Sequence, residues 1–289
     1  MCGIIAVLRR PSSREPARPD EVLDALDRAL AALQSGSDSA DDLRVAAEAI
    51  EAADRSLRGT PGVRTLLDND SLPAQVEQRA LALDEAVLAV EQRLDRGAAA
   101  LSDSEVEAHN AAVVRLKDAV WAVRCDRLRA AAAVADLAGE SRGRAAVEAF
   151  WSVQTALSSL DRLEVRGRDS AGLHLLVRNH GLDLSSPEVA GLLHGRIDDP
   201  LFTSGAVRTP DGMLAFTYKA AAEIGELGDN SRVIREAVRG DDLLHRALAA
   251  DGAETVALCH TRWASVGIIS QPNTHPLNHE EEGVEGPYV

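Results

Sequence analysis

Aromatic residues make up only 3% of the 289 residues, and cysteine occurs three times, at Cys2, Cys125 and Cys259. So few aromatics, in a chain rich in Ala, Leu and Val, favour helices over an all-β sandwich. An odd number of irregularly spaced cysteines does not indicate a disulfide framework. No apolar run is long enough for a membrane span, and the one after Met1 is too short for a signal peptide. We therefore expect a cytoplasmic protein with reduced thiols and no membrane partner.

Positive charge is also scarce. Lys and Arg together number 31 against 46 Asp and Glu, which gives a net charge of -15. Such a surface repels nucleic acid, so we expect no nucleic-acid partner. The chain has no phosphate-binding Gly-rich loop of the Walker or dinucleotide type. Cys259, His260, His275 and His279 could ligate zinc, but their spacing is irregular and no C-x-x-C occurs. We expect no metal and no other cofactor.

Several segments carry the patterns of regular structure. Apolar or alternating runs predict strands at 3–8, 173–177, 213–219 and 254–260. Helices are expected over about 144–163 and 231–250, with a loop over the polar stretch 178–212.

Residues 20–140 differ from the rest because apolar residues recur there at helical spacing. The most regular stripe consists of Val76, Ala80, Leu83, Val87, Val90 and Leu94. Gly59 is a candidate helix stop, and Ser102 with Glu105 forms a capping box. The pattern predicts three to four helices in an antiparallel arm or small bundle. We favour self-packing of the stripes; the alternative, a partner or dimer surface, leaves a homodimer open.

The position of Cys2 raises a chemical question. If Met1 is removed, one residue carries both a thiol and a free α-amine. The amine can accept the thiol proton and later return it to a leaving group, so no separate His or Asp is needed. The resulting thiolate can attack a carboxamide if its oxyanion is stabilised. Chance occurrence of an early cysteine is the alternative.

Two further stretches stand out, "RGRDSAG" at 166–172 and "CHTRWASVG" at 259–267, the latter followed by "NTHPLN". Arg262 follows a predicted strand, where its guanidinium could hold a carboxylate in a bidentate fork. A surface ion pair is the commoner role for a single Arg. Trp263 could line a pocket or belong to the core. Asp169 and Ser170 are typical of a tight turn into a strand.

In this order, the three motifs resemble those of the class II glutamine amidotransferases, a group of N-terminal-nucleophile hydrolases. Within that group they are most similar to the glutaminase domain of glucosamine-6-phosphate synthase. That family has Met-Cys-Gly-Ile, Arg-Gly-Tyr-Asp-Ser-Ala-Gly, His-Thr-Arg-Trp-Ala-Thr-His-Gly and then a His-Pro. Here Arg168 replaces the Tyr, Ser265 the second Thr, and Val266 the second His of the third motif.

The resemblance implies roles for matching residues. Cys2 would be the catalytic nucleophile, and Arg166 and Gly167 would support the new N-terminus. Substrate binding would fall to four residues of the third motif and the segment after it: Arg262, Trp263, Ser265 and His275.

The implied fold is α+β, an αββα sandwich of two antiparallel sheets between helical layers. It would be formed by residues 1–10 and 141–289, with 11–140 as a large helical insertion after the first strand. The family's Asn-Gly oxyanion pair, its Asp for the substrate amine and its sugar-phosphate isomerase domain would all follow Val289. The sandwich would then be incomplete at its C-terminus, and we expect this chain alone to be a weak or inactive glutaminase.

The implied activity is hydrolysis of glutamine to glutamate and ammonia for amination of a sugar phosphate, fructose 6-phosphate. One alternative is an amidophosphoribosyltransferase-like glutaminase, a family that tends to have Tyr where Trp263 stands. Another is a non-catalytic, truncated amidotransferase domain that acts as an interaction module.

Overall fold

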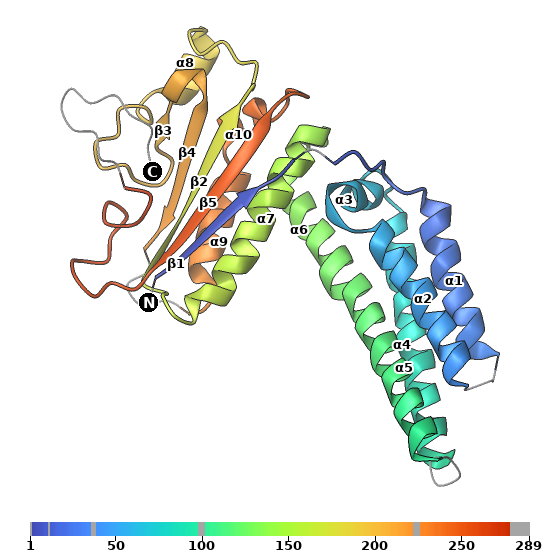
Figure 1. The fold of residues 1–289 in the computed structure, drawn as a ribbon. Coiled ribbons are helices and arrows are strands. Elements are labelled where there is room, and N and C mark those ends of the chain that lie inside the picture. Colours follow the sequence, from blue (N-terminus) through green and yellow to red (C-terminus); the bar gives the residue numbers. More distant parts are fainter. Residues whose placement is uncertain (1, 11, 36–38, 98–101, 222–225, 278–289) are drawn as a thin grey trace. The chain divides into compact units, whose positions relative to one another are not determined.

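The computed structural model describes residues 2–10, 12–35, 39–97, 102–221 and 226–277. Its contacts divide the chain into two compact units (Figure 1). The first, here called the helical unit, is Ser12–Ala135. The second, the sheet unit, combines Met1–Pro11 with Asp136–Val289. The fold is α+β, and each unit is described by itself.

The helical unit contains a four-helix bundle. Its elements, the last of which runs past the unit's end, are α1 (Pro19–Gln34), α2 (Ala40–Ser56), α3 (Gly59–Leu67), α4 (Leu72–Gly97), α5 (Asp103–Trp121), the π-helical η2 (Ala122–Leu128) and α6 (Arg129–Ala138). Helix α1 packs on α2, α2 on α5, α5 on α4, and α4 on α1, which closes the ring. Val76, Leu83 and Val90 of the predicted stripe are buried inside it.

Local sequence explains several helix ends in this unit. The Ser102 side chain accepts a hydrogen bond from the amide of Glu105 and the Glu105 carboxylate accepts one from the amide of Ser102, so the predicted capping box is confirmed. The prediction of Gly59 as a stop was wrong, because Gly59 begins α3 with a positive φ of 67° while α2 already ends at Ser56. Helix α5 continues through η2 into α6 without a break.

The sheet unit is built on one five-stranded antiparallel sheet. Its strands are β1 (Gly3–Leu8), β2 (Ser170–Arg178), β3 (Val207–Arg208), β4 (Leu214–Ala220) and β5 (Glu254–Arg262). Their order is β1-β5-β2-β4-β3, so β1 and β3 are the edges. The four strands that the sequence predicted all form, with ends that differ by a few residues at most. The second sheet of the expected sandwich is not found among the described residues.

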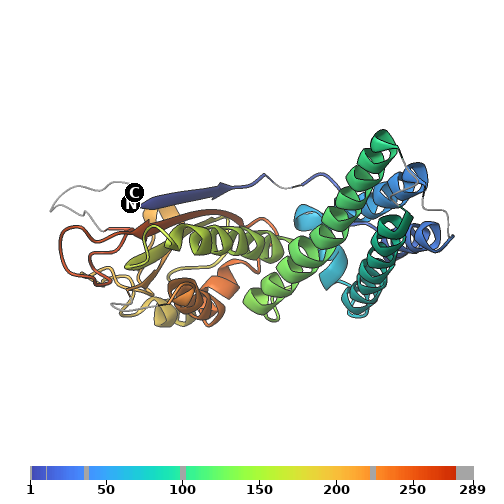
Figure 2. The same ribbon diagram turned by 90° about the horizontal axis from the view of Figure 1, so that it is seen from below.

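Helices cover one face of this sheet (Figure 2). The helices of the unit are α7 (Arg144–Glu164), α8 (Pro187–Leu193), α9 (Asp229–Arg239), α10 (Asp242–Ala247) and the short 3-10 turn η3 (Pro210–Gly212). Helix α7 packs on β1 and β5, and α9 packs on β4 and β2. Alternate strand residues such as Leu173, Phe216 and Cys259 are buried under them. On the opposite face Ile4 and Leu8 remain 77% and 72% exposed.

Two predictions for this unit were wrong. The expected single helix over 231–250 is broken at Gly240 and Asp241, because the Asp241 carboxylate caps a new helix by accepting hydrogen bonds from the amides of Leu243 and Leu244. The expected loop 178–212 contains α8 and the short strand β3. Among the described residues, no helix combines the length and the apolar character needed to cross a membrane.

Candidate functional site

Residues from the three motifs meet at one end of the sheet. Cys2 directly precedes Gly3, the first residue of β1, and Gly3 is the register partner of Thr261. Strand β5 ends one residue later at Arg262, and Arg262 is the register partner of Ser170, where β2 begins. The exposed Cys2 therefore lies at the end of the sheet where β2 begins and β5 ends, and these two strand ends carry the other two motifs. Met1 and His279 lie outside the described residues.

Asp169 ties these chain segments together. Its amide donates a hydrogen bond to the Arg262 carbonyl at 3.2 Å, and its Oδ2 accepts one from the amide of Ala264 at 2.6 Å. On the other side of β5, the Gly3 amide donates to Thr261 Oγ1 at 3.2 Å. The sequence predicted only a tight turn at Asp169, whereas its carboxylate fixes the start of the segment that follows β5.

Arg166 and Gly167 close the C-terminal end of α7. Their amides donate to the carbonyls of Leu163 and Glu164 at 2.9 and 3.2 Å, and Gly167 is buried. The Glu164 side chain is fully buried, and its Oε2 accepts a hydrogen bond from the Gly228 amide at 2.6 Å. Burial raises the pKa of this carboxyl above its ordinary value. No pattern in the sequence predicts this buried acid, because Glu164 stands at a helix end where exposure is usual.

The Arg262 guanidinium is hydrogen-bonded to the turn that follows it. Its Nη2 donates to the Val266 carbonyl at 2.8 Å and its Nη1 to the Ile268 carbonyl at 3.2 Å. Trp263 is 54% exposed, and Ser265 is exposed as well. The structure thus brings Cys2, Gly167 and Arg262 to the same end of the sheet, whereas Trp263 and Ser265 lie on an exposed turn beside it.

His275 lies further along the sheet. Its ring centroid is 4.5 Å from that of His260, and its carbonyl oxygen lies directly over Gly172. An ideal Cβ on Gly172 would come within 1.8 Å of that oxygen, so only glycine allows this approach. Burial, followed by the positive charges of Lys219 and Arg262, lowers the pKa of His275.

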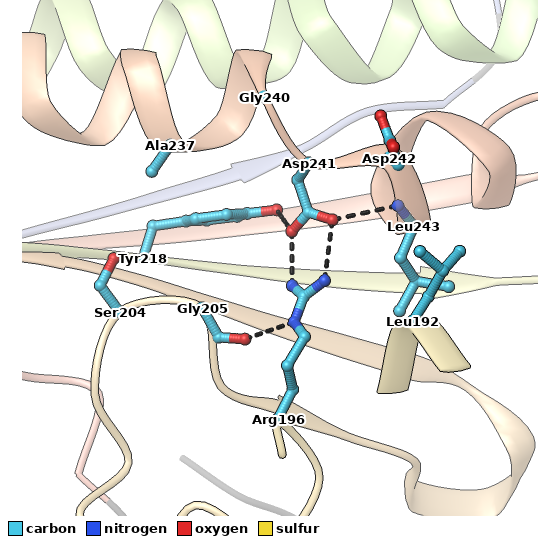
Figure 3. A pocket seen from close by; sticks show the side chains of 10 residues that line it. All are labelled: Leu192, Arg196, Ser204, Gly205, Tyr218, Ala237, Gly240, Asp241, Asp242 and Leu243. Atoms are coloured by element: carbon cyan, nitrogen blue, oxygen red, sulfur yellow. Dashed lines mark hydrogen bonds and ion pairs between the residues drawn. The ribbon is translucent and has the colours of Figure 1, made fainter. Parts of the chain in front are cut away.

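A cavity of about 360 Å³ lies elsewhere in the sheet unit, between the 192–205 segment and the α9–α10 turn (Figure 3). Arg196 donates to both Asp241 oxygens, at 3.0 and 2.5 Å, and Tyr218 Oη donates to Asp241 Oδ2 at 2.8 Å. Arg196 Nε also donates to the Gly205 carbonyl at 2.7 Å. Because these groups satisfy one another, the cluster fastens the 192–205 segment to α10 and offers no free polar group for chemistry.

No group of three or more His, Cys, Asp or Glu side chains in the described part of the chain could hold a metal ion. Comparisons of the chain with models of protein families, with curated proteins and with solved structures found no match. A functional conclusion therefore depends on the sequence motifs and on the geometry of the sheet end.

Proposed function

We propose that this chain carries the glutaminase part of a class II glutamine amidotransferase, with Cys2 as the nucleophile after removal of Met1. Ammonia released from glutamine would aminate a sugar phosphate acceptor, with fructose 6-phosphate as the acceptor that the motif resemblance implies. The proposal rests on the "MCGII", "RGRDSAG" and "HTRWAS" motifs and their similarity to that family.

One observation supports the proposal most directly. Cys2, Asp169 and Arg262 are each more than 90 positions apart in the chain, yet they stand at strand ends that adjoin one another. A thiol at the free end of β1 and a guanidinium at the end of β5 are the two groups needed to attack a carboxamide and to hold the substrate carboxylate. Chance similarity of three short motifs would not require this juxtaposition.

We also propose that the sheet unit is one half of an N-terminal-nucleophile hydrolase sandwich. The antiparallel sheet has α7 and α9 on one face and exposed Ile4 and Leu8 on the other. A second sheet packed on the uncovered face would bury these apolar side chains.

In the proposed reaction, the α-amine of processed Cys2 accepts the thiol proton as the sulfur attacks the glutamine carboxamide. Ammonia leaves with that proton, and water then hydrolyses the thioester to glutamate. Arg262 would hold the α-carboxylate, which requires that its nitrogens exchange the Val266 and Ile268 carbonyls for substrate oxygens.

The test combines three measurements: removal of Met1, labelling of Cys2 and release of ammonia. Mass spectrometry of the protein purified from cells should show loss of Met1, and a glutamine analogue with an electrophilic γ-carbon should label Cys2, with protection by glutamine. Cys2→Ala should abolish both labelling and release of ammonia, whereas Cys125→Ala, in the helical unit, should leave both unchanged. Retained Met1, or labelling that glutamine does not prevent, would overturn the proposal even if turnover is slow.

A non-catalytic interaction module is the second candidate. The observation in its favour is that Trp263 and Ser265 are exposed and that Arg262 is bonded to its own turn. Arg262→Lys separates the two: a glutaminase would lose affinity for glutamine because a lysine cannot form the bidentate fork, whereas an interaction module would show no glutamine-protected labelling in either protein. Arg178→Lys, on the exposed end of β2, is the matched control.

A further inference from the structure

Exposed apolar side chains gather on one surface of the helical unit. Four residues are each between 45% and 58% exposed: Leu81 and Leu88 on α4, and Val114 and Trp121 on α5. The two residues of each pair are seven positions apart and therefore share one face of their helix. Val45 on α2 is the only other large apolar residue in the described part of this unit that is exposed to this degree.

Ion pairs between the helices show that all four residues border the junction of α4 and α5. Lys117 Nζ on α5 lies 2.9 Å from Glu91 Oε1 on α4, and Arg124 on η2 pairs with Asp84 on α4. Each of the four apolar residues stands three or four positions along its helix from one of these charged residues, which places it on the same side of the helix. The two apolar pairs therefore form a strip along the junction, here called the α4–α5 face.

The charges that border this strip without a partner are negative. Lys117 and Arg124 are neutralised by the carboxylates that they bind. Glu85 stands three or four positions from both leucines, and Asp118 stands equally close to the valine and the tryptophan. Both acids are exposed, and neither takes part in an ion pair among the described residues. An apolar strip with an unpaired carboxylate on each side is complementary to an apolar partner that carries positive charge.

A hollow continues the α4–α5 face at its η2 end. Its volume is about 520 Å³, and two of its lining residues, Glu77 and Arg124, pair with each other at 3.3 Å across the junction. Its apolar walls include Leu67, Pro73, Leu128 and Ala131. Arg129 brings an exposed cation to the hollow, whereas Glu85 and Asp118 border the strip itself. The hollow offers room for one bulky apolar side chain of a partner.

We propose that the α4–α5 face binds an amphipathic helix of another protein, one whose apolar side is flanked by lysine or arginine. The apolar residues of that helix would pack on the strip, with a bulky one in the hollow, and its cations would meet Glu85 and Asp118. A second copy of this chain fits less well, because packing strip against strip would bring the acidic borders together. The face goes beyond the proposed glutaminase activity and does not depend on it, since every residue involved belongs to the helical unit.

The experiment measures the binding of three labelled synthetic peptides by fluorescence anisotropy, each of about 18 residues or about five helical turns. The first has a leucine face flanked by lysines, the second has the same face flanked by glutamates, and the third is a scrambled form of the first. The first peptide should bind at least about tenfold more tightly than either of the others. Its binding should weaken as salt is added, because the borders are exposed charges.

Variants decide whether the named residues form the binding surface. Leu88→Gln and Trp121→Gln change exposed side chains, so both proteins should fold, and each should weaken binding of the lysine peptide at least about tenfold. Val45→Gln, which changes an exposed apolar residue on α2, should bind as the unchanged protein does. Glu85→Gln combined with Asp118→Asn should reduce the preference for the lysine peptide over the glutamate peptide.

The proposal would be overturned by equal binding of the lysine peptide to the Leu88, Trp121 and Val45 variants. Equal binding of the lysine peptide and either of the other two by the unchanged protein would also overturn it. Sedimentation tests the remaining occupant: self-association that Leu88→Gln abolishes would show that a second copy of the chain covers the face, against the proposal.

Discussion

At the scale of single residues, Gly172 sets how closely the 268–277 segment approaches the sheet. A Cβ at this position would lie 1.8 Å from the His275 carbonyl oxygen and 3.3 Å from Pro276 Cδ. Gly172→Ala should therefore lift the segment and lower the free energy of unfolding of the sheet unit by about 1–3 kcal/mol, as overpacking does. Urea unfolding measures the change.

Gly191→Ala is the control for this substitution. Nothing lies within 4 Å of a Cβ on Gly191, which stands inside α8. Alanine there should leave stability unchanged or raise it by about 0.5–1 kcal/mol. Equal stability of the two variants would contradict the role given to Gly172.

His174 gives the sheet unit a dependence on pH. Its pKa is about 4 in the folded protein, against an ordinary value of 6.5, because it is buried beside Lys219. Since the folded state favours the neutral ring, its contribution to stability is complete above pH 6.5 and is lost as pH falls from 6.5 to about 4. The loss is on the order of 3 kcal/mol.

Urea unfolding at a series of pH values checks this prediction. His174→Gln should make the decline below pH 6.5 shallower without removing it, because burial also lowers the pKa of His260 to about 4. His194→Gln, which changes an exposed residue, should leave the decline as it is. Ionisation of Lys219 does not interfere, because its pKa lies at about 8 when folded and 10.5 ordinarily. An unchanged slope in the His174 variant would contradict the assignment.

At the scale of elements, Asp54 joins α2 to the π-helical segment. Its side chain is 3% exposed, and it accepts hydrogen bonds from Arg127 Nε at 2.7 Å and Arg58 Nε at 2.8 Å. Asp54→Ala would leave Arg127, whose side chain is only 17% exposed, without this carboxylate and should lower the stability of the helical unit by about 3 kcal/mol. Asp41→Ala, which removes an exposed ion pair with Arg44, should cost about 1 kcal/mol or less.

Circular dichroism during thermal unfolding follows the helices in both variants. A double change, Asp54→Ala with Arg127→Met, should be less damaging than Asp54→Ala alone, because no largely enclosed charge is then left unpaired at Arg127. Similar losses in the Asp54 and Asp41 variants would show that burial of the pair does not matter.

The elements also show what could be predicted from sequence and what could not. Regular stripes such as Val76, Leu83 and Val90 predict helices because burial repeats with the helical period. The break at Asp241 was missed because apolar residues continue at helical spacing through it, although Gly240 and the capping Asp241 are local helix-end residues. The ion pair that also fixes the Asp241 carboxylate comes from Arg196, 45 residues away in the chain. Helix α8 is only seven residues long, too short to carry a clear period.

Some residues of the candidate site could be predicted from the sequence, and others could not. The motifs pointed to Cys2, Arg262 and His275, because chemical residues in a recognisable spacing are visible in the chain itself. Lys219 was missed, since a lysine near the end of an alternating strand is ordinarily exposed. Its burial comes from Phe202 and the segment around Gln271, which are brought to it only by the fold.

At the scale of the whole molecule, two hydrophobic cores share one chain. The helical unit is enclosed by its own helices, and the sheet unit is held by strands from both ends of the chain. Separate cores unfold as separate cooperative units. Calorimetry should show two transitions, with Asp54→Ala lowering the temperature of one and Gly172→Ala that of the other.

Helix α6 crosses the boundary between the units, since it runs from Arg129 to Ala138. If that helix coupled the cores strongly, one substitution would move both transitions. A single transition shifted alike by Asp54→Ala and Gly172→Ala would contradict independent unfolding.

The pairing of β1 with β5 has a consequence for the time course of synthesis. The Gly3 amide donates to a hydroxyl 258 residues further along the chain. At about 5–20 residues per second, a ribosome needs on the order of ten seconds or more to make that partner after β1 has emerged. During this interval the helical unit can fold, whereas β1 has no β5 to pair with. The N-terminus is therefore open to an aminopeptidase until β5 has been made, and Cys2 joins its neighbours only after that.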